Sequence, residues 1–174
     1  MNVRKFLCVL VLAGITLLFM VSCNKKEEQP PDQIMASVSA SAQVTQGESS
    51  LSCTVVRNPE GVGVISVTQP ASLEGLCFEW KGNGYGLSYH GLACEAGTPF
   101  LPSTSFASAI MNVLKSCETM EGLQIQSQED GKTVYSGESE SGRFTITVDN
   151  QDGFIEKISL EDLQLSADFT RMTT

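Results

Sequence analysis

From residue 36 onward, apolar and polar residues alternate in short runs, which Gly, Asn, Asp and Pro interrupt at a spacing of about ten residues. Alternation with period two places one face of each run against a core and is typical of antiparallel strands. Helical segments do not recur between the runs, so the pattern excludes a parallel βαβ arrangement. We predict eleven strands, at residues 36–44, 48–57, 62–69, 76–80, 85–89, 92–95, 123–129, 132–139, 143–149, 153–160 and 163–169.

Turn residues define the connections between these strands. The pair Asn83-Gly84 favours a hairpin, because both residues tolerate positive φ. In the C-terminal half, Gly131, Gly142 and Gly153 follow one another at intervals of eleven residues, each after a polar turn residue. This regular spacing predicts a meander of sequential antiparallel strands.

One segment has the helical period instead. The apolar residues Phe106, Ile110, Val113, Leu114 and Cys117 lie at i, i+4, i+7, i+8 and i+11, which forms a single stripe on a helix. We expect the helix to begin within residues 103–105 and to end near residue 117. A sheet of about eleven strands is too long to stay flat. The expected fold is therefore mainly β (α+β), a strongly curved antiparallel sheet or half-barrel with one central helix packed on it.

The amino-terminal residues follow a different pattern. Two cationic residues, Arg4 and Lys5, precede sixteen uncharged residues at 6–21 and a small residue before Cys23. This apolar run is shorter than the roughly 20 residues of a spanning helix, and the pattern is typical of a signal peptide over 1–22. Residues 23–35 contain few apolar groups and no periodicity, so we expect a disordered tether before a single domain over 36–174.

The segment Met20-Val21-Ser22-Cys23 resembles the bacterial lipoprotein signal, in which an apolar residue and two small residues precede an obligatory cysteine. The resemblance implies that Cys23 carries diacylglycerol, that the chain is cut before it, and that the new amino terminus accepts a further acyl group such as palmitate. Two or more acyl chains hold a protein stably at a membrane. The expected location is the extracytoplasmic face of the cell membrane; an ordinary secretory signal is the alternative.

The acidic net charge of the chain excludes nucleic acid from the expected partners. The chain has a net charge of −9, and without residues 1–22 it keeps 9 basic residues against 20 acidic ones, a net charge of −11. Nucleic-acid binding depends on Lys and Arg that neutralise phosphates, so we predict no nucleic-acid role. The sole histidine, His90, lies beside a glycine in a predicted turn, where no base–nucleophile pair is indicated. We therefore predict no enzyme activity, no cofactor and a monomer.

Four cysteines lie in the body of the chain: Cys53, Cys77, Cys94 and Cys117. Their spacing lacks a Cys-x-x-Cys pair, so a metal site is not expected. Strand alternation directs Cys53 and Cys94 towards the core and Cys77 away from it. Because the helix folds back after its strand, we hypothesise a disulfide between Cys94 and Cys117; four reduced thiols are the equal alternative.

The element order over residues 36–170 resembles the lipoprotein-carrier fold of the LolA, LolB and mycobacterial LppX type. That resemblance implies an eleven-stranded half-barrel whose concave face is plugged by helices and can hold acyl chains. Residues 70–80 also resemble a segment of small clostridial-type lipoproteins of unassigned function, which implies no activity.

Aromatic and aliphatic residues gather on the hairpin around residue 83 and on the helix. We interpret them either as ordinary core or as the lining of a cleft that admits a lipid or another apolar ligand. These candidate ligand-binding residues are Phe78, Trp80, Leu87, Tyr89, Phe106, Ile110 and Met111. The expected function is a non-catalytic lipoprotein that binds or carries an apolar molecule; a protein–protein interaction module of the cell envelope is the alternative.

Overall fold

The structure is a computed structural model that describes residues 30–82, 84–97 and 100–172. The predicted signal peptide and Cys23 lie outside these residues. Eleven strands form one antiparallel sheet, in the order β6-β5-β4-β3-β2-β1-β11-β10-β9-β8-β7. The strands are β1 (Val38–Gln46), β2 (Ser49–Arg57), β3 (Gly63–Gln69), β4 (Cys77–Lys81), β5 (Gly84–Tyr89), β6 (Leu92–Ala96), β7 (Gln124–Glu129), β8 (Lys132–Ser139), β9 (Gly142–Asp149), β10 (Ile155–Leu160) and β11 (Leu165–Arg171).

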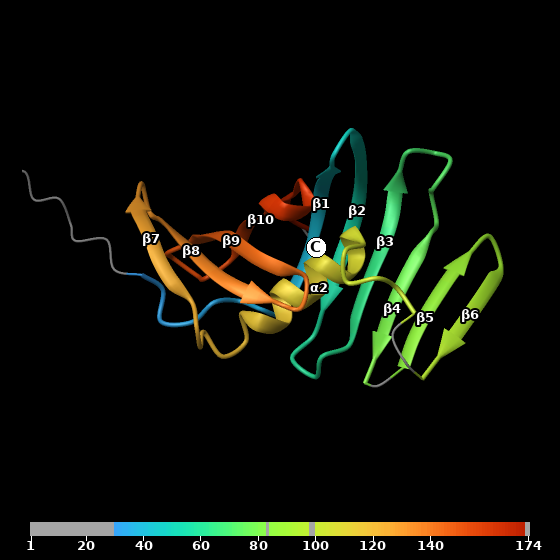
Figure 1. Ribbon diagram of the computed structural model, residues 1–174, viewed down its shortest axis with the longest axis horizontal. Coiled ribbons are helices and arrows are strands. Elements are labelled where there is room, and N and C mark those ends of the chain that lie inside the picture. The colour runs from blue at the N-terminus through green and yellow to red at the C-terminus, as the bar shows by residue number, and fades with distance from the viewer. Residues whose placement is uncertain (1–29, 83, 98–99, 173–174) are drawn as a thin grey trace, which may run out of the picture.

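This strand order joins two meanders at the middle of the sheet. Strands β1 to β6 pair in sequence on one side, strands β7 to β11 pair in sequence on the other, and β1 pairs with β11 between them. The chain between β6 and β7 therefore has to return from one edge of the sheet to the other. It does so through helix α2 (Phe106–Ser116), which crosses the concave face (Figure 1). The predicted fold class is confirmed.

Local sequence signals explain both ends of α2. Ser105 is the N-cap residue, and its hydroxyl accepts a hydrogen bond from the Ser108 amide at 3.3 Å. Lys115 lies in the last turn, where its charge is favourable beside the exposed carbonyl groups. The residues that the helix buries include Ile110, Val113 and Leu114. They pack against small and branched residues of the central strands, which form the core.

The helix is much shorter than the sheet is wide. Its 11 residues extend about 16 Å at 1.5 Å per residue. Eleven strands spaced about 4.8 Å apart extend about 48 Å across the sheet. The helix therefore covers the middle of the concave face, and the strands at both ends of the sheet extend beyond it (Figure 1).

The four body cysteines match the alternative of reduced thiols and not the hypothesised disulfide. Cys53, Cys77, Cys94 and Cys117 are all free, so the bond between Cys94 and Cys117 is absent. Cys117 is buried at the C-terminal end of α2, whereas Cys94 is exposed on β6, the outermost strand. Cys94 does point to the concave face, but the helix does not extend far enough to bury it. Cys53 is buried, and Cys77 is half-buried on the opposite face.

The final strand and the first residues also differ in detail from the sequence pattern. The predicted strand 163–169 begins two residues late, because a short 3₁₀ turn, η1 (Glu161–Leu163), precedes it and Gln164 adopts a left-handed conformation with φ 48°. Before β1, Ile34 is 2% exposed and packs in the core. Residues just before 36 are thus in contact with the domain.

Candidate functional site

The apolar face of the sheet continues beyond the helix onto β4, β5 and β6. In an antiparallel sheet, directly paired residues point to the same face. The register forms three rows across these strands: Trp80–Tyr85–Ala96, Phe78–Leu87–Cys94 and Tyr89–Leu92. None of these side chains carries a charge. The charged residues of the same strands, such as Glu79 and Lys81, point to the convex face, where they form an ion pair.

The cover on this apolar face thins from β4 towards β6. Phe78 is 6% exposed, because the Phe106 ring of α2 packs edge-on against it with ring centroids 5.5 Å apart. Beyond that contact the rows open, and Leu92 is 76% exposed. We call the row residues beyond Phe78 the open shelf. Leu92 and Cys94 are exposed, and the others are half-buried: Trp80, Tyr85, Leu87, Tyr89 and Ala96.

The seven candidate ligand-binding residues divide between core and shelf. Trp80, Leu87 and Tyr89 belong to the open shelf. Trp80 and Leu87 also pack against the edge of the core, as Phe106 does, whereas Phe78, Ile110 and Met111 are buried in it. The sequence interpretation omitted Tyr85 and Leu92, although alternation through residues 85, 87 and 89 already places Tyr85 on this face.

The space between helix and sheet is filled rather than hollow at its centre. Met111 packs so closely on β3 that a Cβ atom added to Gly63 would lie 2.7 Å from its Cε atom. Glycine at this position therefore allows the methionine to contact the strand backbone. An apolar ligand would lie on the open shelf and not beneath the helix.

Aromatic contacts hold the shelf side chains in place. The Trp80 and Tyr85 rings pack edge-to-face with centroids 6.5 Å apart. The Tyr89 hydroxyl donates a hydrogen bond to the Ser72 carbonyl at 2.6 Å, and its ring contacts His90 at 4.2 Å between centroids. The shelf is thus an apolar surface with a polar edge at its turn.

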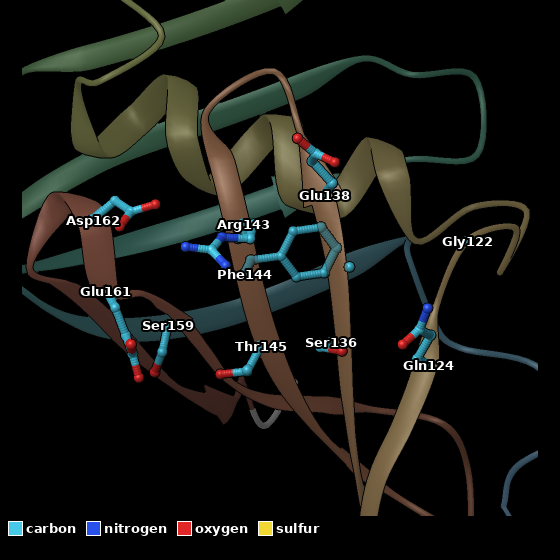
Figure 2. Close-up of a pocket in the computed structure, with 11 residues that line it drawn as sticks. Gly122, Gln124, Ser136, Glu138, Arg143, Phe144, Thr145, Ser159, Glu161 and Asp162 are labelled. Carbon is cyan, nitrogen blue, oxygen red and sulfur yellow. The ribbon is translucent and has the colours of Figure 1, made fainter.

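A second depression lies on the convex face over the other half of the sheet. It is an open groove of about 380 Å³, and Figure 2 shows polar side chains around it. Arg143 is the one basic residue of its lining, beside the carboxylates of Glu138, Glu161 and Asp162. Hydroxyl and amide groups, two glycines and the Phe144 ring complete the lining, so the groove is of mixed polarity and carries charge, unlike the open shelf. Its remaining residues are Gly122, Gln124, Ser136, Gly137, Phe144, Thr145 and Ser159.

The histidine and the buried cysteines are the other candidates for site chemistry. His90 is exposed in the turn between β5 and β6, with φ 48°, and no cluster of metal-ligating residues occurs in this part of the chain. Burial raises the pKa of Cys53 to about 12. Burial also raises the pKa of Cys117 to about 12, despite the opposing effect of Arg57. These two thiols are neutral and unreactive at physiological pH.

The start of the described chain docks beside the turn before β10. The Met35 amide donates to the Gly153 carbonyl at 2.7 Å. The buried Arg57 guanidinium donates to the Ala36 carbonyl at 3.2 Å and forms an ion pair with Glu118 after the helix. The chain therefore enters the domain on the side of β7–β10, away from the shelf (Figure 1).

Comparisons with known proteins define the fold but not an activity. No protein-family model and no curated protein matches the sequence. An uncharacterized conserved protein from Thermus thermophilus shares the fold, with a TM-score of 0.50, 14% identity, and coverage of 79% of this chain and 81% of that chain.

Two further solved structures are more distant. A LolA superfamily protein from Nitrosomonas europaea has a TM-score of 0.36 and 10% identity, over 80% of this chain and 67% of that chain. The CwlD amidase of Clostridioides difficile in complex with the GerS lipoprotein has a TM-score of 0.41 and 15% identity, over 71% of this chain and 77% of that chain. Among the described residues, no helix is long and apolar enough to span a membrane.

Proposed function

We propose that this chain is a non-catalytic extracytoplasmic lipoprotein, anchored to the cell membrane through Cys23, whose open shelf binds the acyl chain of a lipid. The observation that supports binding is the uncharged apolar face of β4–β6, which extends past the helix and leaves Leu92 76% exposed. Contiguous exposed apolar surface of this kind marks an interaction site.

The chemistry of the shelf favours an acyl chain over a polar ligand. Its rows offer aliphatic and aromatic carbon, and the strands' charged groups point to the other face. Burial of apolar surface stabilises by about 25 cal/mol per Å², so an extended hydrocarbon chain gains from every residue it covers. The Tyr89 hydroxyl and His90 lie at one end of the shelf, where a polar head group would remain in water.

The protein's own anchor is a poor occupant. The docked residue Gln33 lies at the turn before β10, and β6 is seven strand positions away, about 34 Å along the sheet. Ten residues from Cys23 reach about 35 Å only when fully extended. Stretching the tether to that limit would cost much of its conformational entropy. We therefore propose a separate molecule as the ligand.

Trp80 provides a direct assay, because it is the only tryptophan of the chain and belongs to the shelf. Dibromostearate, added below its critical micelle concentration, should quench Trp80 emission in a saturable manner, since bromine quenches on contact. Unlabelled stearate should compete and restore the emission.

A matched pair of variants tests the location. Leu92→Glu should weaken binding by about tenfold or more, because a shelf side chain is lost and a charge introduced. Ile125→Glu makes the same change at a residue 50% exposed on β7, at the far edge, and should leave binding unchanged. Unquenched Trp80 emission, or equal effects of the two variants, would refute acyl binding at the shelf.

The anchor has its own test. Cys23→Ser should move the protein from the membrane fraction to the soluble fraction. Retention of this variant in washed membranes would contradict anchoring by Cys23.

A further inference from the structure

Strand β6 is a free sheet edge with little protection. It is the outermost strand of the sheet, and no described segment lies beyond it (Figure 1). Natural edge strands avoid pairing with other chains by means of prolines, lysines or bulges. β6 has none of these, pairs with β5 in unbroken register, and carries one charge, Glu95. The opposite edge, β7, is polar and has a register shift between Ile125 and Ser127.

The hairpin fixes which backbone groups of β6 face outward. β5 and β6 are joined by the two-residue turn His90-Gly91, so Tyr89 and Leu92 form the hydrogen-bonded pair that closes it. Hydrogen-bonded and non-hydrogen-bonded pairs alternate along an antiparallel ladder. The amide and carbonyl groups of Ala93 and Glu95 therefore point to the free edge, whereas those of Cys94 point to β5.

We infer that β6 pairs antiparallel with the β6 of a second copy of this chain, about a two-fold axis at Cys94. In that register the backbone amide and carbonyl of Ala93 form two hydrogen bonds with those of the partner's Glu95. The Glu95 backbone forms the same two hydrogen bonds with the partner's Ala93, which makes four in all. The side chains are complementary as well. Leu92 lies opposite the small Ala96 of the other copy, and Glu95 lies opposite Ala93, so no like charges are directly opposed.

The charge distribution permits this contact despite the acidic character of the chain. The whole protein has a net charge of −9, yet residues 77–97 contain only Glu79, Glu95 and Lys81 as formally charged groups. The ion pair between Lys81 and Glu79 leaves one uncompensated carboxylate per copy at this end. Pairing would also join the two open shelves into one apolar surface. This inference replaces the monomer expected from the sequence and does not depend on acyl binding.

Two lysine substitutions on adjacent residues test the register. Both Ala93 and Cys94 are exposed, so each variant should fold, which circular dichroism checks. Ala93→Lys places an ammonium opposite the Glu95 of the other copy, twice per dimer, and should tighten association about fivefold. Cys94→Lys places two ammonium groups directly opposite each other and should weaken it about tenfold or more. Sedimentation equilibrium in reducing buffer measures the dimer dissociation constant of each variant.

The two variants change the net charge equally, so a general charge effect would move both dissociation constants in the same direction. That result, or a wild-type protein that remains monomeric at millimolar concentration, would overturn the inference.

Cys94 also allows the dimer to be trapped. In a non-hydrogen-bonded pair the two Cα atoms lie about 4.5 Å apart, within the range of about 4.4–6.8 Å for a disulfide. With oxidised glutathione, two Cys94 thiols should form a disulfide, while glutathione accepts the two electrons and two protons and leaves as two thiols. Cys94→Ser should abolish the covalent dimer, and Cys77→Ser, the same change on β4, should not. A covalent dimer that persists in Cys94→Ser would contradict the proposed register.

Discussion

Replacing Gly153 by alanine should detach the N-terminal segment from the domain. Gly153 has φ 74°, and a Cβ atom there would overlap the Gln33 carbonyl oxygen and lie 3.4 Å from the Ile34 Cα. These are backbone atoms, so no side-chain rotation relieves the contact. The least costly response is for the segment that contains Ile34 to leave its site.

The expected loss in the free energy of unfolding follows from the contacts that the N-terminal segment gives up. Ile34 is 2% exposed, and its full exposure costs about 1.5–3 kcal/mol. The hydrogen bond from the Met35 amide to the Gly153 carbonyl contributes about 0.5–1.5 kcal/mol. The released residues regain chain entropy, which offsets part of the loss. We expect release of the segment to lower the free energy of unfolding by about 2–4 kcal/mol at most. Alanine at this positive φ adds a further left-handed strain of about 1–2 kcal/mol.

Gly131→Ala is the matched control. Gly131 has φ 76° and also follows an aspartate between two paired strands, but its added Cβ meets no atom within 4 Å. Urea denaturation should therefore show a small loss in the free energy of unfolding for Gly131→Ala and a larger loss for Gly153→Ala. Limited proteolysis should cleave near residue 33 in Gly153→Ala only. Equal losses, with the segment still protected, would refute the reasoning.

Three other predictions concern stability. Because burial raises the pKa of Cys53 and Cys117 to about 12, above the 9.0 of an exposed thiol, the free energy of unfolding should fall by about 1.4 kcal/mol per thiol between pH 7 and pH 10, measured by urea denaturation. Gly137→Ala should lose about 1–3 kcal/mol in thermal denaturation, because its Cβ would overlap two apolar side chains. Glu118→Gln should lower the free energy of unfolding by about 1 kcal/mol, since it removes the charged partner of buried Arg57. The loss is modest because the Glu118 side chain is 41% exposed and solvent screens the ion pair.

Each of these has a result that would count against it. The thiol prediction fails if Cys53→Ala leaves the pH dependence unchanged. Gly137→Ala as stable as the parent protein would mean that the neighbouring side chains move freely. A Glu118→Gln variant that loses no stability at either low or high salt would show that the ion pair does not stabilise the fold.

The strands and the helix follow from local sequence. Alternation and turn glycines are short-range features, so the predicted strand 92–95 corresponds to Leu92–Ala96, and the predicted helix overlaps Phe106–Ser116. Each strand's two faces are likewise defined by its own alternation. The curved eleven-stranded sheet with a helix across it could be predicted because a single helical segment stood between two long strand series.

Coverage of the sheet could not be predicted in this way. Alternation correctly placed Cys94 on the concave face, but it is exposed, because an 11-residue helix spans about a third of the sheet and the sequence does not state which strands remain uncovered. The docking of Ile34 beside Gly153 joins residues more than a hundred positions apart, with no periodic signal at either one. The sequence by itself determined the elements and their faces, since these depend on neighbours along the chain. Only the tertiary structure decided which faces are buried, since burial depends on what packs above them.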